Sequence, residues 1–388
     1  MFSATSMQSA SANADSGAGG LRQTPAPSPA SRRLRTLFKT VLKVVLTVGA
    51  FYLLLTHAVR TESGEKVIAL RAIVDYLPQI DAGVFWRATL VAFLVRCCGV
   101  FCAMVRWYLL LRGQGMVFPI GHIVTTFLIG RFLGTFLPST IGLDGYKLYD
   151  AARFSGRTVE VAAATVVEKG LGVIGIFLAF LVTLPWGYKI LGTRATLVAV
   201  ITVPTSVLLI GAFFLLAFKP QIVAFALDRL PVNRRGRLAS VLERVNASAA
   251  AYKDQRALVI AAAVLSFFVH FCTAVTYYFT ALAIGAAHAD FWEVSFASTI
   301  QIFATVMSPF TIAGEGVREI VQTLLLAHKI GTSQSILSAA LGFWAAEAPT
   351  LSGGIFYFMR HDGYRPRVEL RPSAPPARCG SETTRSAI

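Results

Sequence analysis

Long apolar segments, separated by short stretches rich in glycine, proline or charge, recur along most of the chain. Most are long enough to cross a bilayer as helices, because about 20 apolar residues span its hydrocarbon core. The pattern therefore predicts an all-α, polytopic membrane protein with about 6–8 transmembrane helices. The predicted segments are 37–56, 85–111, 117–137, 160–184, 195–218, 257–285, 292–312, a shorter one at 317–328, and 335–359.

Basic residues are concentrated beside particular apolar segments, and this distribution predicts the orientation of the chain. Arginine and lysine are in excess before the first segment, in the loop 219–256 and in the tail after Arg360. Such an excess marks the cytoplasmic side of a membrane, so both termini are predicted to lie in the cytoplasm. The membrane itself is predicted to be the inner membrane of the cell. The loop 57–84 has little basic excess and is predicted to lie outside.

Composition agrees with this membrane class. The chain is 55% hydrophobic and only 14% charged, which excludes an ordinary soluble domain. The net charge of +16 lies mainly beside apolar segments, so topology explains it better than nucleic-acid binding does. The five cysteines and six histidines form no metal-ligand or disulfide pattern, and we expect no metal or other cofactor.

The composition and the apolar segments divide the chain into three predicted regions. Residues 1–34 and 361–388 are rich in small, polar, proline and basic residues, and both are predicted to be disordered tails. Residues 35–360 are predicted to form one membrane domain, with repeat motifs near 131–169 and 307–347.

The two repeat motifs are the most informative feature of the chain. Residues 138–147 read Pro-Ser-Thr-Ile-Gly-Leu-Asp-Gly-Tyr-Lys, and residues 309–318 read Pro-Phe-Thr-Ile-Ala-Gly-Glu-Gly-Val-Arg. Proline, glycine and charge are costly in lipid and are tolerated only where protein or a water-filled cavity surrounds them. A duplicated broken segment of this kind predicts a transporter-like binding site at a repeat interface.

The predicted cytoplasmic loops also conflict with the number of apolar segments. Three segments lie between Arg112 and Lys219, and three long ones lie between Arg256 and Arg360. An odd number of crossings cannot return to the same side, so we predict that each motif segment enters part-way and reverses. The hairpins would then enter from opposite sides as an inverted repeat. Alternatively, a weak span is miscounted, or 317–328 crosses fully.

The motif residues suggest how the site could bind an anion. Asp144 with Lys147, and Glu315 with Arg318, stand three residues apart and could pair if each turn runs into a helix, near Tyr146 or Val317. Basic side chains would meet a phosphate while acids hold them in place; alternatively, these charges only fix the hairpin geometry. Lys147, Arg318 and Arg131 are predicted to bind the phosphate where the hairpins meet. The candidate substrate-binding or transport residues are Arg131, Pro138, Asp144, Lys147, Glu168, Pro309, Glu315, Arg318, Glu319 and Glu347.

Three arginines of the segment 85–111 need separate explanations. Arg87 and Arg106 are expected to reach opposite membrane faces. Arg96 lies near the middle of the segment and needs a partner inside the bundle, for which Glu168 and Glu347 are candidates. The histidines, His122 among them, follow no pattern and are expected to be structural or interfacial.

These motifs resemble a known family. Residues 131–145, followed by Lys147, are similar to the first signature of the lysylphosphatidylglycerol synthase transmembrane-region family, and 309–319 to the second. Pro-Ser-Thr replaces the usual Pro-Gly in the first motif, and Ser-Pro-Phe-Thr replaces Pro-Gly-Ser in the second. The resemblance implies a flippase-like protein whose motifs line a lipid pathway. About 28 residues follow Arg360, too few for the family's synthase domain, so that activity is expected to be absent.

Three functions therefore stand open. The leading hypothesis is a non-enzymatic translocase for an anionic phospholipid or a lipid-linked envelope precursor, with membrane lipids as its partners. The second is a membrane-embedded enzyme or accessory subunit of envelope lipid synthesis. The third is a secondary transporter of small solutes. No catalytic residue is assigned under any of them.

Overall fold

The computed structural model describes residues 41, 45, 48–49, 52–56, 58–60, 66–136, 141–218, 252–286, 288–307 and 316–360. All of these except Val41 belong to one compact unit, Leu42–Ile388, and the following sections concern that unit. The predicted tails 1–34 and 361–388 lie outside the described residues, as do Pro138, Pro309 and Glu315.

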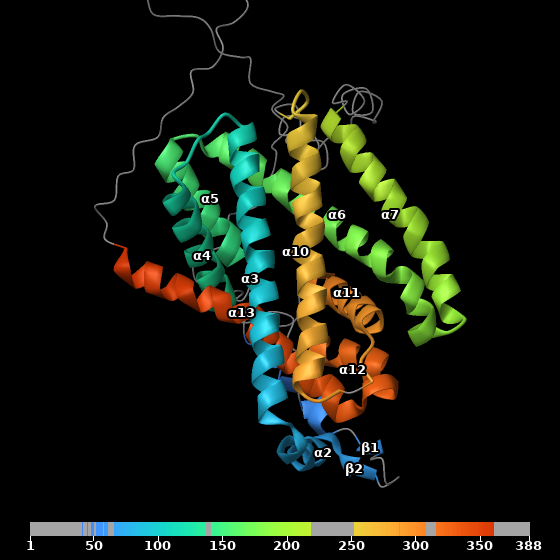
Figure 1. Ribbon diagram of the computed structural model, residues 1–388. Coiled ribbons are helices and arrows are strands. Elements are labelled where there is room, and N and C mark those ends of the chain that lie inside the picture. The colour runs from blue at the N-terminus through green and yellow to red at the C-terminus, as the bar shows by residue number, and fades with distance from the viewer. Residues whose placement is uncertain are drawn as a thin grey trace, which may run out of the picture. The chain divides into compact units, whose positions relative to one another are not determined.

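Helices make up most of the described chain (Figure 1). Before the first long helix stand a two-stranded antiparallel sheet, a helix of two turns and a 3₁₀ turn, none of which was predicted in the loop 57–84. These elements are β1 (Ala58–Arg60), β2 (Lys66–Ile68), α2 (Ala69–Tyr76) and η1 (Leu77–Gln79). The longer helices are α3 (Ala82–Gly113), α4 (Ile120–Phe136), α5 (Ile141–Ser155), α6 (Thr158–Leu191), α7 (Arg194–Phe218), α10 (Arg256–Ala283), α11 (Phe291–Met307), α12 (Val317–Ile330) and α13 (Thr332–Met359).

The membrane class is confirmed by the length and apolarity of these helices. Within the described residues, four helices are long and apolar enough to span a bilayer: α3, α6, α10 and the part Arg194–Leu215 of α7. The apolar part of α4, Ile120–Thr135, is shorter. The chain is thus an all-α, polytopic membrane protein, whereas the part-way entry of α4 and α11 stays a prediction.

The duplication extends well beyond the two motifs. Helices α3 to α6 and α10 to α13 follow one another in the same order, and α4 and α11 begin at Ile120 and Phe291 and end at Phe136 and Met307. Both pairs of bounds differ by 171 positions, which is also the separation of the motifs. Each half of the domain is therefore one four-helix repeat, and α7 follows the first repeat as an additional helix packed on α6.

The two repeats are inverted, as predicted. Their first helices, α3 and α10, pack against each other in opposite directions (Figure 1). At one end, Tyr252 and Gln255 before α10 hydrogen-bond the carbonyls of Leu110 and Gly113 at the end of α3, each at 2.8 Å. At the other end, the beginning of α3 lies beside the end of α10.

The helical hairpin of each repeat packs on the last helix of the other repeat. The hairpin α4–α5 packs through α4 on α13, and the hairpin α11–α12 packs through α11 on α6. Glycine allows the close approach in both places. A Cβ atom at Gly353 would lie 2.1 Å from the carbonyl oxygen of Leu128, and one at Gly187 would lie 2.4 Å from the ring of Phe296. This exchange brings polar residues of both repeats into shared clusters.

One element of the first motif was predicted wrongly. A helix was expected to begin near Tyr146 after a loose glycine-rich turn, but α5 already begins at Ile141. Gly142, Asp144 and Gly145 therefore lie inside the first turns of a helix rather than in a loop. In the second motif the helix α12 begins at Val317, as predicted.

Candidate functional site

A buried ionic cluster joins α3, α5 and α6 around the carboxylate of Glu168. Lys147 Nζ of α5 donates to both oxygens of Glu168, at 2.9 and 2.8 Å. Arg106 Nη2 of α3 donates to Glu168 Oε1 at 3.2 Å, and its Nη1 donates to Ser266 Oγ of α10 at 3.0 Å. We call these residues the Glu168 cluster. Two cations share one carboxylate there.

Aromatic rings complete the surroundings of Lys147, which is only 1% exposed. Its Nζ lies 4.8 Å from the ring centroid of Trp107 and 5.0 Å from that of Phe127, both distances at which a ring face attracts a cation. An isolated ammonium group would be costly at this depth, and the carboxylate and the two rings offset that cost. The Nε of Arg106, in contrast, is buried without a hydrogen-bond partner among the described residues.

The predicted pair of Asp144 with Lys147 is wrong. Asp144 instead pairs with Lys169 of α6, at 2.6 Å. Glu168 and Lys169 are consecutive residues of α6, and both contact α5. The buried Lys147 therefore pairs with the buried Glu168. The more exposed Asp144 takes Lys169, whose side chain is 55% exposed. The expectation that Arg106 reaches a membrane face is also wrong, since that side chain is buried beside Glu168.

A second, half-buried cluster forms between the repeats, around Glu347 of α13. Its carboxylate accepts from Arg131 Nη2 at 3.4 Å and from Thr135 Oγ1 at 3.0 Å, both on α4, and from Thr350 Oγ1 at 3.2 Å. Arg131 Nε is buried without a hydrogen-bond partner among the described residues, as Arg106 Nε is. We call this group, together with Arg96, the Glu347 cluster.

Arg96 adds a second cation to that cluster. Its Nε donates to the carbonyl oxygen of Ala346 at 3.1 Å, and its Nη1 donates to Thr273 Oγ1 at 2.7 Å. It also lies near enough to Glu347 and Arg131 to interact electrostatically with both. Of the two acids proposed as its partner, Glu347 is therefore the one nearby, although a carbonyl and a hydroxyl make the direct contacts.

The second motif contributes a buried pair at the start of α12. Glu319 Oε2 accepts from the backbone N–H of Gly316 at 2.7 Å and so caps the helix. Arg318 pairs with Glu319 at 3.7 Å and lies 4.4 Å above the ring of Phe343. Arg318 therefore contacts Glu319 and Phe343, whereas Lys147 contacts Glu168, Trp107 and Phe127. The predicted pairing of Arg318 with Glu315 lies outside the described residues.

An ionic group near one end of the domain joins the last helix of the second repeat to the hairpin of the first. Asp150 of α5 pairs with Arg360, just after α13, at 2.6 Å, and its Oδ2 lies 3.3 Å from Nε2 of His122 on α4. Thr126 donates to the same carboxylate at 2.5 Å, and Arg360 also donates to the Tyr146 hydroxyl. We call this group the Asp150 bridge.

The opposite end carries a related group, which we call the Glu293 bridge. Glu293, near the start of α11, pairs with Lys189 at the end of α6 at 3.7 Å and with Lys329 of α12 at 3.3 Å. Lys189 and Arg360 are 171 positions apart, and so are His122 and Glu293. In both bridges, the last helix of one repeat is therefore held to the hairpin of the other.

Sequence reasoning missed both bridges. It gave no role to Asp150, Lys189 or Glu293, used Arg360 only to predict the side of the membrane, and expected His122 to be structural or interfacial. The signal was present, because aligning the halves at the motif separation superimposes the charged ends of α6 and α13. Among the described residues no group of three or more His, Cys, Asp or Glu side chains is placed to hold a metal ion.

Comparison with known proteins agrees with the geometry. The family model described as Lysylphosphatidylglycerol synthase TM region matches residues 40–351. This span holds both motifs, the Glu168 cluster, the Glu347 cluster and the Glu293 bridge. A search of curated proteins found no match.

Proposed function

Because the chain belongs to the lysylphosphatidylglycerol synthase TM region family, we propose that it translocates an anionic phospholipid, or a lipid-linked precursor of the cell envelope, across the membrane. The family links the chain to membrane lipids. The observation that carries the proposal is the excess of cations over acids in the buried Glu168 cluster and the half-buried Glu347 cluster.

Charge in these clusters is balanced only in part. Lys147 and Arg106 share Glu168, while Arg96 and Arg131 share Glu347. Each cluster thus has one more positive than negative charge, in a part of the protein where uncompensated charge is costly. A phosphate headgroup would remove the excess. The Nε atoms of Arg106 and Arg131 would be available to such a group, and arginine can hold phosphate through two parallel hydrogen bonds.

The inverted repeat supports a route across the membrane. In transporters built this way, one repeat moves against the other around a site near the midplane. Here the two bridges link the repeats at opposite ends of the α3–α10 pair, so opening one while the other holds would expose the clusters to one side at a time. The lipid would move chemically unchanged. The loop 219–256 and both termini would face the cytoplasm, with the protein in the inner membrane.

Reconstitution tests this function. Purified protein in liposomes should move headgroup-labelled phosphatidylglycerol to the other leaflet faster than protein-free liposomes do. Arg131→Gln should slow this movement by about tenfold, the size expected when one charge-assisted contact is lost. Thr135→Val, which removes a neutral donor from the same carboxylate, should have a smaller effect.

Three outcomes would contradict the proposal. Chemical alteration of the label would indicate a membrane-embedded enzyme. Proton- or sodium-dependent uptake of a soluble anion, without lipid movement, would indicate a small-solute transporter. Equal movement of anionic and neutral lipids, unchanged in Arg131→Gln, would exclude the buried cations as the binding groups.

A further inference from the structure

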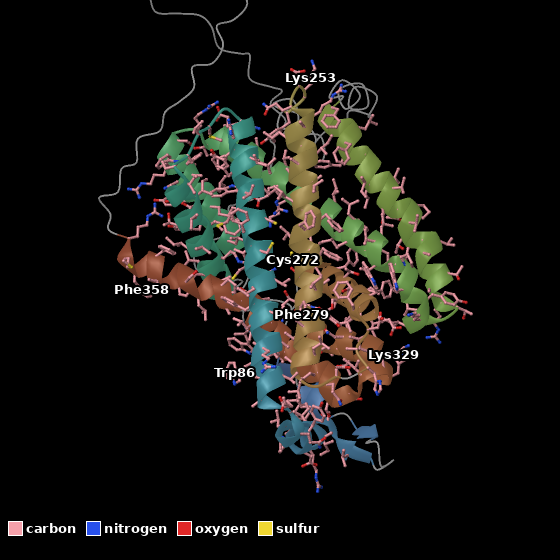
Figure 2. All side chains as sticks on the ribbon, viewed as in Figure 1. Trp86, Lys253, Cys272, Phe279, Lys329 and Phe358 are labelled. Atoms are coloured by element: carbon pink, nitrogen blue, oxygen red, sulfur yellow. The ribbon has the colours of Figure 1, made fainter. Side chains whose placement is uncertain are left out.

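An open groove lies between the beginning of α3 and the end of α10, away from both ionic clusters. Its volume is about 510 Å³, within the range of small-molecule sites. Figure 2 shows Trp86 and Phe279 near this end of the helix pair and Lys253 at the other end. The lining residues are Val84, Arg87, Ala88, Val91, Phe279, Leu282, Gly285 and Ala286.

Arg87 is the only charged residue of this lining, and all the others are apolar. Its side chain is exposed, and it makes no hydrogen bond or ion pair with another residue of the described part of the chain. Trp86, 69% exposed, stands beside it, and tryptophan is the residue that favours the boundary between headgroups and hydrocarbon. The apolar groove therefore carries one cation, at the expected depth of lipid headgroups.

The inverted repeat supplies an internal comparison. The corresponding junction, between the end of α3 and the beginning of α10, is filled by Tyr252, which is 1% exposed. A Cβ atom at Gly113 would lie 2.5 Å from the Tyr252 ring. Burial raises the pKa of Tyr252, so its hydroxyl keeps the proton that it donates to the carbonyl of Leu110.

The open junction carries smaller residues at three of the matching positions. At the separation of 171, Asp81 corresponds to Tyr252, Ala88 to Val259 and Gly285 to Gln114. Asp81 turns to the backbone N–H of Val84, at 2.7 Å, and caps α3, so it fills no space between the helices. Gly285 has a φ of +78°, a conformation that favours glycine, which keeps side-chain atoms out of the groove at this position. At the other junction the hydroxyl of Tyr76 of α2 donates to the carbonyl of Ile284 at 2.7 Å, while the groove beside Ala88 stays open. The first junction is closed by Tyr252, and its counterpart is closed only in part.

We propose that this groove binds one diacyl phospholipid, with an acyl chain against the apolar wall and the headgroup phosphate on Arg87. The phosphate supplies the negative charge that Arg87 lacks among its described neighbours, and the acyl chain covers the exposed side chains of Val84 and Val91 and the half-buried Phe279. The site is separate from the clusters proposed to translocate lipid. Lipid binding in the groove can therefore be tested independently of lipid transport.

Photocrosslinking in liposomes tests this site. A phosphatidylglycerol probe with a diazirine on one acyl chain should label peptides that contain residues 84–91 and 279–286. Arg87→Gln should lower the yield on these peptides by roughly five- to tenfold, as expected for the loss of one charge-assisted contact. Arg71→Gln removes an exposed arginine of α2 outside the lining and should leave the yield unchanged.

A second variant tests the groove without changing charge. Val91→Trp, at a lining position that is 38% exposed, should fill it and abolish the labelling while the headgroup-flipping rate and the thermal unfolding temperature stay near those of the parent. A diacylglycerol probe, which has no phosphate, should label equally weakly in the parent and in Arg87→Gln.

Three results would overturn the proposal. The first is labelling that is equal in the parent and in Arg87→Gln. The second is displacement of the probe by a polyprenyl phosphate but not by phosphatidylglycerol. The third is disulfide dimerisation of Val91→Cys in a background free of other cysteines, with loss of labelling, which would show that a second copy of the chain covers the groove.

Discussion

Glu168 is the residue on which the first buried cluster depends, because its carboxylate alone pairs with both Lys147 and Arg106. Glu168→Gln would keep the shape of the side chain and remove the one carboxylate that both buried cations contact. Removing one partner of a buried ionic group costs about 3–5 kcal/mol. We therefore expect a clearly lower unfolding temperature in detergent, measured by the fluorescence of the native tryptophans.

Asp144→Asn is the matched control for that variant. It breaks the pair with Lys169, whose side chain is largely exposed, and exposed pairs contribute about 0–1 kcal/mol. Its unfolding temperature should stay close to that of the parent. Equal losses in both variants would mean that burial does not determine what these pairs contribute.

The sequence predicted the ionisable residues of the interior better than their partners. Lys147, Glu168, Arg131 and Glu347 could be selected because charge is rare in apolar segments. Which residues pair depends on the face of α5 that contacts α6. Because α5 begins at Ile141 and not near Tyr146, the face that contacts α6 differs from the expected one. Rotation about a helix axis is set by packing, which no local pattern in this segment records.

At the scale of elements, the contact between α4 and α13 depends on a glycine. Gly353→Ala would place a methyl group within 2.1 Å of the Leu128 carbonyl, which is backbone and cannot rotate away. We expect a loss of about 1–3 kcal/mol in unfolding free energy, the range for overpacked cores. Gly211→Ala in α7 meets nothing within 4 Å and should be neutral or slightly stabilising, because alanine favours helix.

Thermal unfolding of the two alanine variants, side by side, checks this prediction. A destabilised Gly211→Ala and an unchanged Gly353→Ala would indicate that α4 and α13 do not pack closely.

The apolar segments themselves were well predicted: the segment 195–218 corresponds to α7 at Arg194–Phe218, and 257–285 corresponds to α10 at Arg256–Ala283. The start of helix α5 was predicted too late because its two glycines and several charges resemble a loop.

The two bridges allow a paired experiment on single helix ends. Arg360→Gln should remove the link from α13 to Asp150 and raise amide hydrogen exchange in 146–155 and 352–360. Lys189→Gln should act at the other end, raising exchange in 185–191 and 291–296. Each variant is the control for the other. Increased exchange at both ends in either variant would mean that the ends do not open separately.

The arrangement of the whole domain predicts which ends of the chain share a side of the membrane. Helix α3 has 32 residues, about 48 Å at 1.5 Å per residue, longer than the hydrocarbon core of about 30 Å. Its antiparallel partner α10 begins where α3 ends, so Lys253 and Asp75 should face opposite sides. The basic excess of the loop 219–256 predicts that Lys253 lies on the cytoplasmic side.

Single cysteines test this orientation once the five native cysteines have been replaced. Asp75→Cys should react with a membrane-impermeant maleimide in intact cells, because the side chain of Asp75 is 68% exposed on α2. Lys253→Cys should react only after permeabilisation. Ser155→Cys, at the end of α5 and near the same end of the domain as Lys253, should behave like Lys253→Cys if the first hairpin enters from the cytoplasm. Labelling of Ser155→Cys from outside would exclude that entry, and the Asp150 bridge would then have to face the exterior.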